Sequence, residues 1–377
     1  MNFGLTDEQE LIRRTVRDFA ESRVAPVAEE LDREARFPYE LVAELAELGL
    51  MGLPIPEEYG GAGGDTVSYA ITIEELTRID SSVAITVAAH TSLGTMPIYL
   101  FGSEEQKREW LPRLASGEGL AAFGLTEPDA GSDAGATRTK ASLIDGEWVI
   151  DGSKIFITNA GTDISACVTI TAVTGDGEIS NIIVPNGTAG YEISAPMKKL
   201  GWHASDTREL SFNGCRVPEG NLLGERGRGF RQFMKILDGG RISVASMGVG
   251  LAQGAYDLAL AYAKERRQFG KAIAEFQAIQ FQLADMATEI DAGRQLVYRA
   301  AWLKDQGRDF ALAAAQAKLF TGILSNKVVN SALQIHGGYG FMEEFAISRL
   351  YRDQKILEIG EGTNEVQRMV IAKHLGL

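Results

Sequence analysis

The residues most able to do chemistry lie near the C-terminus, where one glutamate stands between two glycines in Gly360-Glu361-Gly362. Glycines permit unusual backbone conformations and close approach to a ligand. A carboxylate carried there is poorly placed for packing and well placed to face a bound molecule. In a dry site, loss of hydration raises the carboxyl pKa toward the working pH, as a general base requires. A solvated loop glutamate is the alternative, and the spacing alone favours that alternative.

Two segments in the middle of the chain have residue types suited to a flat or phosphorylated ligand. The run Phe123–Asp133 contains amides and hydroxyls that could hold a heterocycle edge or a phosphate, although an ordinary loop with an Asx-turn has the same composition. The run Lys154–Asn159 alternates so that Phe156 and Thr158 share one face of a strand. An aromatic beside a hydroxyl suits a flat cofactor, but a half-buried strand shows the same alternation.

Three segments after residue 230 suit anionic ligands. Leu237–Arg241 is interpreted as a helix start, where Arg241 opposes the helix dipole; a phosphate or adenine ligand would explain the residue, and so would a surface ion pair with Asp238. Glu265–Ile273 holds three cations suited to a pyrophosphate, with a solvated helix end as the alternative. Gln334–Gly340 has three glycines in four positions, which favours either ligand approach or a helix C-cap.

Composition excludes several classes of function. The chain has 377 residues, enough for two or three domains, and its 45% hydrophobic and 23% charged content is typical of a soluble globular protein. A formal net charge of −14 and a pI near 4.9 argue against nucleic-acid binding, which needs a basic face. We expect a soluble, cytoplasmic protein, because no leader segment is apparent and charge, Gly or His interrupts the apolar stretches before membrane-spanning length.

The cysteines and histidines do not form a metal-binding pattern. No CxxC pair occurs, and we expect Cys167 and Cys215 to be two buried thiols. The four histidines are widely scattered in the sequence: His90, His203, His336 and His374. We therefore expect no metal site.

Secondary-structure signals divide the chain into three parts. We expect an N-terminal helical domain over residues 1–118, a middle antiparallel, β-barrel-like domain over 119–225, and a C-terminal helical bundle over 226–377. This helical, β, helical order excludes a doubly wound α/β fold, in which helices and strands alternate. The expected helices begin at a Thr6–Gln9 capping box and at Pro38, and others span 66–78, 81–100 and 103–114. The expected strands are 141–144, 147–150, 154–158, 166–173 and 179–184, with turns at Asp145-Gly146, Asp151-Gly152 and 175–177.

Taken together, the motifs resemble those of the acyl-CoA dehydrogenases. The resemblance is carried by five sequences in order: Thr-Glu-Pro-Asp-Ala-Gly-Ser-Asp, Phe-Ile-Thr, Arg-Arg-Gln-Phe-Gly, Gln-Ile-His-Gly-Gly-Tyr-Gly and Glu-Gly-Thr-Asn-Glu-Val-Gln-Arg. It extends essentially from Met1 to Leu377 and agrees with the helical, β, helical order. The resemblance implies that order of domains, with FAD bound between the β-domain and the C-terminal helical domain.

The resemblance also implies which residues contact the FAD. Near the flavin ring it implies Phe123, Leu125, Thr126, Ser132, Phe156, Ile157 and Thr158, with the Thr158 hydroxyl near flavin N5. Around the pyrophosphate and adenosine it implies Arg266, Phe269, Gln277, Gln334, Ile335, His336, Gly337 and Gly338. In the family, these distal groups reach the FAD of a neighbouring subunit, which implies an oligomer, usually a tetramer built as a dimer of dimers. Thr363 and Glu365 would also touch FAD.

For the acyl-CoA substrate, the resemblance implies contacts from Asp238 and Arg241 to the nucleotide, and from Ser132 and Gly362 along the pantetheine and acyl path. Glu361 would take the α-proton while the β-hydrogen leaves as hydride to flavin N5, giving a trans-2-enoyl-CoA. Its backbone N–H and a flavin ribityl hydroxyl would polarise the thioester carbonyl. Electrons would pass to an electron-transferring flavoprotein, in fatty-acid or branched-chain amino-acid catabolism.

Two positions refine the resemblance. Some relatives, including the isovaleryl-specific type, carry the base just before the position of Arg241; here that residue is Gly240, which has no carboxylate. The chain is therefore nearer the short-chain, medium-chain and short-branched types. Many relatives have Trp where this chain has Phe156. An acyl-CoA oxidase or another flavoenzyme of the same fold, or a non-catalytic acyl-CoA-binding scaffold, is the alternative.

Overall fold

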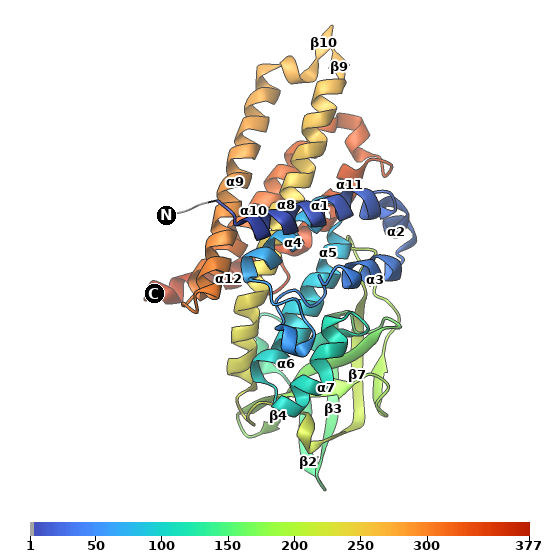
Figure 1. The fold of residues 1–377 in the computed structure, drawn as a ribbon, viewed down its shortest axis with the longest axis vertical. Helices are drawn as coiled ribbons and strands as arrows, with labels where there is room; N and C mark the ends of the chain where they lie inside the picture. The colour runs from blue at the N-terminus through green and yellow to red at the C-terminus, as the bar shows by residue number, and fades with distance from the viewer. Residues whose placement is uncertain (1–3) are drawn as a thin grey trace.

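Helices occupy both ends of the chain and strands its middle, as a computed structural model that describes residues 4–377 shows (Figure 1). The helical, β, helical order is therefore confirmed. The N-terminal helices are α1 (Asp7–Phe19), α2 (Ala28–Glu34), α3 (Tyr39–Glu47), α4 (Thr66–Ile79), α5 (Ser81–Ala88), α6 (Met96–Phe101) and α7 (Glu104–Ala115).

Local capping residues determine where several of these helices begin. Thr6 and Gln9 form the expected capping box of α1, and Ser103 and Gln106 form one for α7. Pro38 is the N-cap of α3, as expected. The sequence patterns did not predict α2, which has no side-chain cap and follows directly on the π-helical segment Ala20–Val24. Packing of Leu31, which is fully buried, stabilises that short helix.

The helical run Ser81–Phe101 differs from the expectation that apolar stretches stop short of membrane-spanning length. It combines α5, a π-helical segment (Ala89–Thr95) and α6, and among the described residues it is long and apolar enough to cross a membrane by length and composition. Of its most apolar window, 78% is buried inside the protein. Val83 and Val87 on α5 are fully buried. The run is apolar because it is a core helix.

The middle of the chain forms one sheet of eight strands. They are β1 (Leu120–Gly124), β2 (Lys140–Ile144), β3 (Glu147–Thr158), β4 (Ser165–Gly175), β5 (Glu178–Pro185), β6 (Tyr191–Ile193), β7 (Thr207–Pro218) and β8 (Leu222–Leu223). The strand order is β6-β7-β3-β2-β4-β5-β8, with β1 beside β4. Pairing is antiparallel except where β4 meets β1 and β2, so the expectation of a mostly antiparallel sheet is confirmed.

Turn residues were predicted correctly at one end of β3 and wrongly within it. Asp145 and Gly146 have φ angles of 54° and 81°, the positive values of a tight hairpin turn, as expected between β2 and β3. Asp151-Gly152 was expected to end a strand, but β3 continues through it. The register with β7 shifts between Ile150 and Gly152, so the glycine marks a β-bulge instead of a turn.

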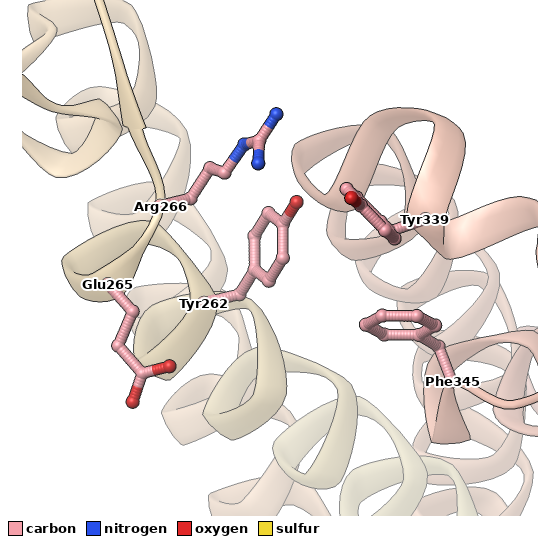
Figure 2. Close-up of a pocket in the computed structure, with 5 residues that line it drawn as sticks. All are labelled: Tyr262, Glu265, Arg266, Tyr339 and Phe345. Atoms are coloured by element: carbon pink, nitrogen blue, oxygen red, sulfur yellow. The ribbon is translucent and has the colours of Figure 1, made fainter.

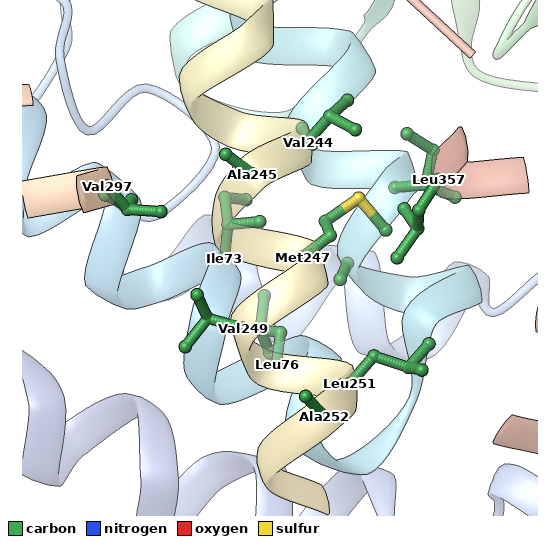
Figure 3. Packing of buried hydrophobic residues seen from close by; sticks show 14 of the residues in the cluster. Ile73, Leu76, Val244, Ala245, Met247, Val249, Leu251, Ala252, Val297 and Leu357 are labelled. Carbon is green, nitrogen blue, oxygen red and sulfur yellow. The ribbon is translucent and has the colours of Figure 1, made fainter. Parts of the chain in front are cut away.

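The C-terminal part is built around one central helix. Its elements are α8 (Gly229–Glu265), the two-stranded hairpin β9 (Arg267–Gln268) and β10 (Lys271–Ala272), α9 (Gln277–Asp305), α10 (Ala311–His336), α11 (Ala346–Asp353) and α12 (Asn364–His374). Figure 1 shows α8 running almost the full length of the molecule, from the sheet to the β9–β10 hairpin. Figure 3 shows residues of α8 packed between side chains of α4 and α9.

Small residues allow neighbouring helices to approach α8 closely. A Cβ at Gly250 would lie 2.2 Å from the carbonyl oxygen of Glu74 on α4, so only glycine fits at that contact. Around it Met247, Val249 and Leu251 are fully buried. The helix is therefore rigidly held on several sides, which suits an element that carries part of a site.

The beginning of α8 contradicts one sequence interpretation. Leu237–Arg241 was interpreted as a helix start, but α8 begins at Gly229 and Arg241 lies three turns inside it. Phe233 and Ile236, at helical spacing, are 1% and 2% exposed. Their burial stabilises helix before Gly239-Gly240, where intrinsic propensity predicts a break. Arg241 therefore does not face the positive end of the helix dipole.

A buried ion pair attaches the loop after β1 to strand β3. The Nζ of Lys154 lies 2.7 Å from Oε1 of Glu127, and the two side chains are 0% and 6% exposed. Glu127 also accepts hydrogen bonds from the backbone N–H groups of Arg138 and Thr139, at 2.6 and 3.0 Å. These bonds hold the pKa of Glu127 at about 2 despite its burial, and they fix both ends of the loop.

Breaking this pair should destabilise the protein strongly. Lys154→Met removes the ammonium but keeps a long unbranched side chain, so the buried Glu127 carboxylate loses its partner. We expect the free energy of unfolding, measured by urea titration, to fall by about 3–5 kcal/mol. The matched control is Arg216→Met, which removes the exposed pair with Glu147 in the same sheet and should cost less than about 1 kcal/mol. Equal losses in the two variants would contradict the role assigned to Lys154.

Candidate active site

Glu361 lies in the short connection between the 3-10 segment Gln354–Glu358 and α12. Its φ angle is 51°, and that of Gly362 is 92°. A left-handed conformation is uncommon for a residue other than glycine and is concentrated at functional sites. Gly360 does not share it, so the unusual backbone belongs to Glu361 and Gly362. Thr363 follows as the N-cap of α12.

The carboxylate of Glu361 points inward against helix α8. Its Oε2 atom is buried and has no hydrogen-bond partner among the described residues. A Cβ at Gly240 would lie 2.0 Å from this Oε2 and 3.3 Å from Cδ2 of Leu93. Glycine at position 240 is therefore required for the carboxylate to occupy this place. A side chain at position 240 would occupy the space that the Glu361 carboxylate fills, so the chain can carry a base at only one of these two positions.

Burial makes this carboxyl group a competent base near neutral pH. Desolvation raises the pKa of Glu361 to about 7, and the positive charges of Lys318 and Arg241 oppose that rise. A carboxylate with a pKa close to the working pH accepts a proton readily and is ionised often enough to act. The alternative of a solvated loop glutamate, which spacing alone favours, does not hold for this fold.

Side chains from α10 and α12 donate hydrogen bonds to the carbonyl oxygens of Glu361 and Gly362. The Gly362 carbonyl accepts hydrogen bonds from Lys318 Nζ at 2.8 Å and from Gln367 Nε2 at 2.9 Å. Gln367 Nε2 also lies 3.4 Å from the Glu361 carbonyl oxygen. The Glu361 N–H makes no hydrogen bond within residues 4–377. A free N–H beside a base suits an oxyanion-hole arrangement.

Apolar side chains line the space between α8 and the first strand of the sheet. Phe123 on β1 packs with Phe233 and Ile236 on α8, and Leu93 and Leu125 contact the same cluster. Phe123 is 8% exposed. This arrangement creates a water-poor wall beside Glu361 of the kind that strengthens electrostatic effects in a site.

The residues expected around a flavin ring meet where β3 passes the loop after β1. The Ile155 N–H donates to the Thr126 carbonyl at 2.9 Å, which joins the two segments. Phe156 has a φ of 63° and is 61% exposed, an unusual state for an aromatic side chain in a sheet. Thr158 is half-buried, but the Ile157 side chain is only 3% exposed and belongs to the sheet core. An exposed, strained aromatic fits a flat ligand that stacks on it.

The residues expected at the pyrophosphate and adenosine form a second, separate group. Figure 2 shows Tyr262 and Arg266 at the end of α8 facing Tyr339 and Phe345 across a pocket of about 240 Å³. The Arg266 guanidinium lies 5.4 Å from the centre of the Tyr339 ring. Of the residues expected here, Ile335 and His336 are buried, Arg266 is partly buried, and the exposed ones are Phe269, Gln277, Gln334, Gly337 and Gly338.

The two groups are far apart within one chain. Arg266 follows Gly240 by 26 residues along α8, which is about 39 Å at the helical rise of about 1.5 Å per residue. The structure therefore brings Glu361, Phe123, Leu125, Thr126, Phe156 and Thr158 to one end of α8 and the Arg266 group to the other end. A ligand that needs both groups at once would take them from different chains.

Of the remaining expected site residues, Arg241 is buried, Asp238 is half-buried, and Ser132 and Glu365 are exposed. Arg241 is 1% exposed, its Nη1 donates to Asp238 at 2.5 Å, and its charge acts on Glu361. This inward position does not favour the expected contact with a surface nucleotide; the half-buried Asp238 remains available for one. Ser132 and Glu365 are exposed, and Glu365 pairs with Arg368 at 3.2 Å.

Sequence reasoning missed two residues that support the base. Lys318 and Gln367 are both fully buried and both bond the Gly362 carbonyl. A signal for Lys318 existed, because it is the one charged residue of the run Ala311–Leu324. Gln367 lies four residues after Thr363 in α12 and gave no such signal.

Other chemical candidates in the sequence have simpler placements. Cys167 and Cys215 are both buried and free, as expected. No group of three or more His, Cys, Asp or Glu side chains that could hold a metal ion occurs among residues 4–377. Burial raises the pKa of both thiols, which keeps them protonated and unreactive near neutral pH.

The raised pKa predicts how stability depends on pH. The carboxyl group ionises at its ordinary pKa of 4.5 when unfolded and at about 7 when folded, so the folded protein binds the proton more tightly. Stability contributed by the protonated form is therefore lost as pH rises from about 4.5 through about 7. We expect Glu361→Gln, which resembles the protonated form, to be more stable than the wild type at pH 8 by on the order of 3 kcal/mol.

Thermal unfolding at pH 5 and pH 8 measures this effect. The advantage of Glu361→Gln should be fully present at pH 8 and fall to about 1 kcal/mol at pH 5. Glu344→Gln, at an exposed glutamate before α11, is the control and should show no such pH-dependent difference. An equal difference between wild type and Glu361→Gln at both pH values would contradict the burial of the charge.

Comparison with known proteins gives a consistent match over the whole length. Family models match in order: acyl-CoA dehydrogenase N-terminal domain over residues 6–118, middle domain over 122–215 and C-terminal domain over 227–376. The probable acyl-CoA dehydrogenase YngJ of Bacillus subtilis is 53% identical over 380 aligned positions, which cover 100% of both proteins.

Solved structures agree with this match. Butyryl-CoA dehydrogenase from Megasphaera elsdenii has a TM-score of 0.97 and 44% identity, with 100% of both chains covered. A chain in a structure described as the electron transferring flavoprotein of Acidaminococcus fermentans also has a TM-score of 0.97 and 44% identity, and covers 100% of this chain and 99% of that one.

Proposed function

The chain belongs to the acyl-CoA dehydrogenase family, and on this premise we propose that it oxidises a short-chain acyl-CoA to the trans-2-enoyl-CoA with Glu361 as the base. As a family member it is a flavin-dependent oxidoreductase whose cofactor is FAD. The observation that carries the proposed mechanism is the buried, unpartnered Oε2 atom of Glu361 beside Gly240.

The residues of this chain account for the proton-transfer half of the reaction. Glu361 takes the proton from the α-carbon of the thioester and holds it on its carboxyl group, whose pKa of about 7 suits this role. The Glu361 N–H donates to the thioester carbonyl, which stabilises negative charge as it develops there. The carbon–carbon double bond then forms as the β-hydrogen departs with its electron pair. When bound, FAD supplies the acceptor for this hydride.

The residues expected around FAD fit a flat, phosphorylated molecule in two places. Phe156 and Thr158 offer an exposed aromatic face and a hydroxyl beside the loop that carries Leu125, Thr126 and Ser132. Arg266 and the glycine turn after α10 offer a cation and unhindered backbone at the far end of α8, and a Cβ at Gly337 or Gly338 would meet nothing within 4 Å. Because Gly240, beside the base, and Arg266 lie about 39 Å apart along α8, we propose that each FAD is shared by two subunits.

The proposed substrate is short because buried side chains close the space beyond the base. Leu93 stands beside Gly240, and one turn further along α8 the Ser243 Oγ lies 3.4 Å from that of Ser92. Tyr69 on α4 is 4% exposed and donates to the Ala88 carbonyl at 3.1 Å. These packed groups leave little depth for an acyl tail. The butyryl-CoA dehydrogenase that the chain resembles acts on a four-carbon acyl group, which agrees with this inference.

The assembly, partner and location are part of the same proposal. We propose a tetramer built as a dimer of dimers, in the cytoplasm, with an electron-transferring flavoprotein as the electron acceptor. The similarity to a chain in the Acidaminococcus fermentans flavoprotein structure supports that partner. The exposed hydrophobic side chains of α9, α10 and α12 support an association between subunits, and include Phe281, Trp302, Phe320, Ile323 and Met369.

Removing the base should uncouple substrate binding from oxidation. We expect Glu361→Gln to bind FAD and remain yellow, because its carboxamide keeps the shape of the protonated acid. Its flavin should bleach at least about 1,000-fold more slowly than that of the wild type when acyl-CoA is added without oxygen. The measurement is the flavin absorbance after anaerobic mixing, with Glu344→Gln as a control that should bleach normally.

Three results would redirect this assignment. Near-normal bleaching of Glu361→Gln would show that another group takes the α-proton. Rapid peroxide formation by the reduced wild-type enzyme in air would instead favour an acyl-CoA oxidase, the second candidate of the same fold. A wild type that binds acyl-CoA but never bleaches would favour a non-catalytic scaffold.

A panel of acyl-CoA thioesters should show the depth of the pocket. We expect the wild type to be reduced fastest by the four-carbon straight chain, and at least about tenfold more slowly by eight carbons, because each misfitting methylene costs about 1–3 kcal/mol. Leu93→Ala should lower the ratio of the four-carbon rate to the eight-carbon rate, because it enlarges the space beside Gly240. Faster reduction by eight carbons than by four in the wild type would contradict a short pocket.

A further inference from the structure

Two lysines among residues 4–377, Lys154 and Lys318, are fully buried, and their surroundings differ. Lys154 is paired with Glu127, and it also bonds the hydroxyls of Thr137 and Thr171 at 3.1 and 3.0 Å. Lys318, in the middle of α10, makes no ion pair within residues 4–377; its one hydrogen bond goes to the Gly362 carbonyl at 2.8 Å. Burying a cation without an ion-pair partner lowers the stability of the fold, which suggests that Lys318 is kept for a functional reason.

The other charges near Lys318 already have partners. Arg241 on α8 bonds Asp238 at 2.5 Å. Glu358, at the end of the 3-10 segment, pairs with Lys355 at 2.5 Å, and Glu365 on α12 pairs with Arg368 at 3.2 Å. Of the four charged groups that act on Lys318, Glu361 is therefore the one left without an ion pair among the described residues. Tyr69 on α4 faces Glu361 as a neutral phenol, because burial raises its pKa.

Lys318 also supports the unusual backbone at the base. Its ammonium and the Gln367 amide converge on the Gly362 carbonyl from α10 and α12. That carbonyl follows two residues with positive φ, Glu361 and Gly362, whose conformation persists only if the surroundings hold it. A Cβ at Gly362 would lie 2.8 Å from Gln367 Nε2, so the absence of a side chain at Gly362 lets the Gln367 amide approach this turn closely.

We propose that Lys318 is a positioning residue for Glu361: its ammonium, with Gln367, holds the Gly362 carbonyl and places an unpaired positive charge beside the carboxylate. The bond fixes the turn from which the Glu361 carboxylate and N–H face the substrate. The charge favours the ionised carboxylate in a site that otherwise disfavours it. This inference rests on the proposed function of Glu361 as the base.

Electrostatics agrees with this geometry. Lys318 has a larger effect than Arg241 in lowering the pKa of Glu361. Burial in turn lowers the pKa of Lys318 to about 8, while the charge of Glu361 opposes that fall. The two groups titrate as a coupled pair, so the active form has Glu361 ionised and Lys318 protonated. Activity should therefore decline below about pH 7, where Glu361 is protonated, and above about pH 8, where Lys318 loses its proton.

The test is the pH profile of kcat/KM, which reports the ionisations of the free enzyme. In the wild type we expect an acid limb near 7 and an alkaline limb near 8. Lys318→Met keeps the length of the side chain without its charge. We expect it to lose the alkaline limb and to shift the acid limb upward by about one pH unit, which lowers kcat/KM at pH 6 about tenfold.

Three variants complete the comparison. Lys318→Arg keeps a charge that does not titrate in this range, so it should keep the acid limb near 7 and lose the alkaline limb. Lys327→Met removes an exposed lysine of the same helix, paired with Glu289, and should leave both limbs unchanged. Gln367→Met should lower kcat without moving either limb, because it removes a hydrogen bond and no charge.

Several outcomes would overturn the inference. A folded, FAD-containing Lys318→Met with the wild-type profile would do so. If that variant does not fold, an alkaline limb near 8 that persists in Lys318→Arg would do so instead. These failures are distinguishable from failure of the proposed function, because that failure appears as normal bleaching of Glu361→Gln regardless of the residue at 318.

Discussion

The contact between the Glu361 carboxylate and the α-carbon of Gly240 is the constraint on which the rest of the site depends. An anion is held out of water against a helix whose residue at that point has no side chain. The contact needs a long helix that continues through two glycines, a turn with positive φ angles, and helices packed closely enough to exclude solvent. Each of these features is unfavourable alone, and the packing of α4, α8 and α10 stabilises them together.

The buried charges of the protein show why this site is chemical and not merely structural. Glu127 is satisfied by Lys154 and by backbone N–H groups. Far from the site, Glu75 is satisfied by Arg17, with its Oε1 2.6 Å from the guanidinium. Around Glu361, by contrast, a buried carboxylate oxygen has no hydrogen-bond partner among the described residues, and the lysine that acts on it makes no ion pair within them. Structural ion pairs lower the cost of burial, whereas this arrangement keeps a proton acceptor reactive.

Local signals predicted much of the fold, and they failed where tertiary packing outweighed propensity. Capping residues placed α1 and α7, and Asp145-Gly146 placed the β2–β3 hairpin, because these effects act over a few residues. Asp151-Gly152 was misinterpreted because pairing with β7 carries β3 through it as a bulge. The start of α8 was misplaced because burial of Phe233 and Ile236 outweighs the low helix propensity of Gly239-Gly240.

For the site, residue types and family motifs identified Glu361 and the two groups expected to hold FAD, but not their distances or charges. Residue order is enough to place a carboxylate between glycines, to rule out a rival base at Gly240, and to group the chain with the acyl-CoA dehydrogenases. The desolvation of Glu361, the need for glycine at 240 and the hold of Lys318 and Gln367 on the turn arise from packing between distant segments. The physical reason is that the pKa of a group depends on the charges and solvent around it, and α8, α10 and α12 supply these surroundings from segments distant in sequence.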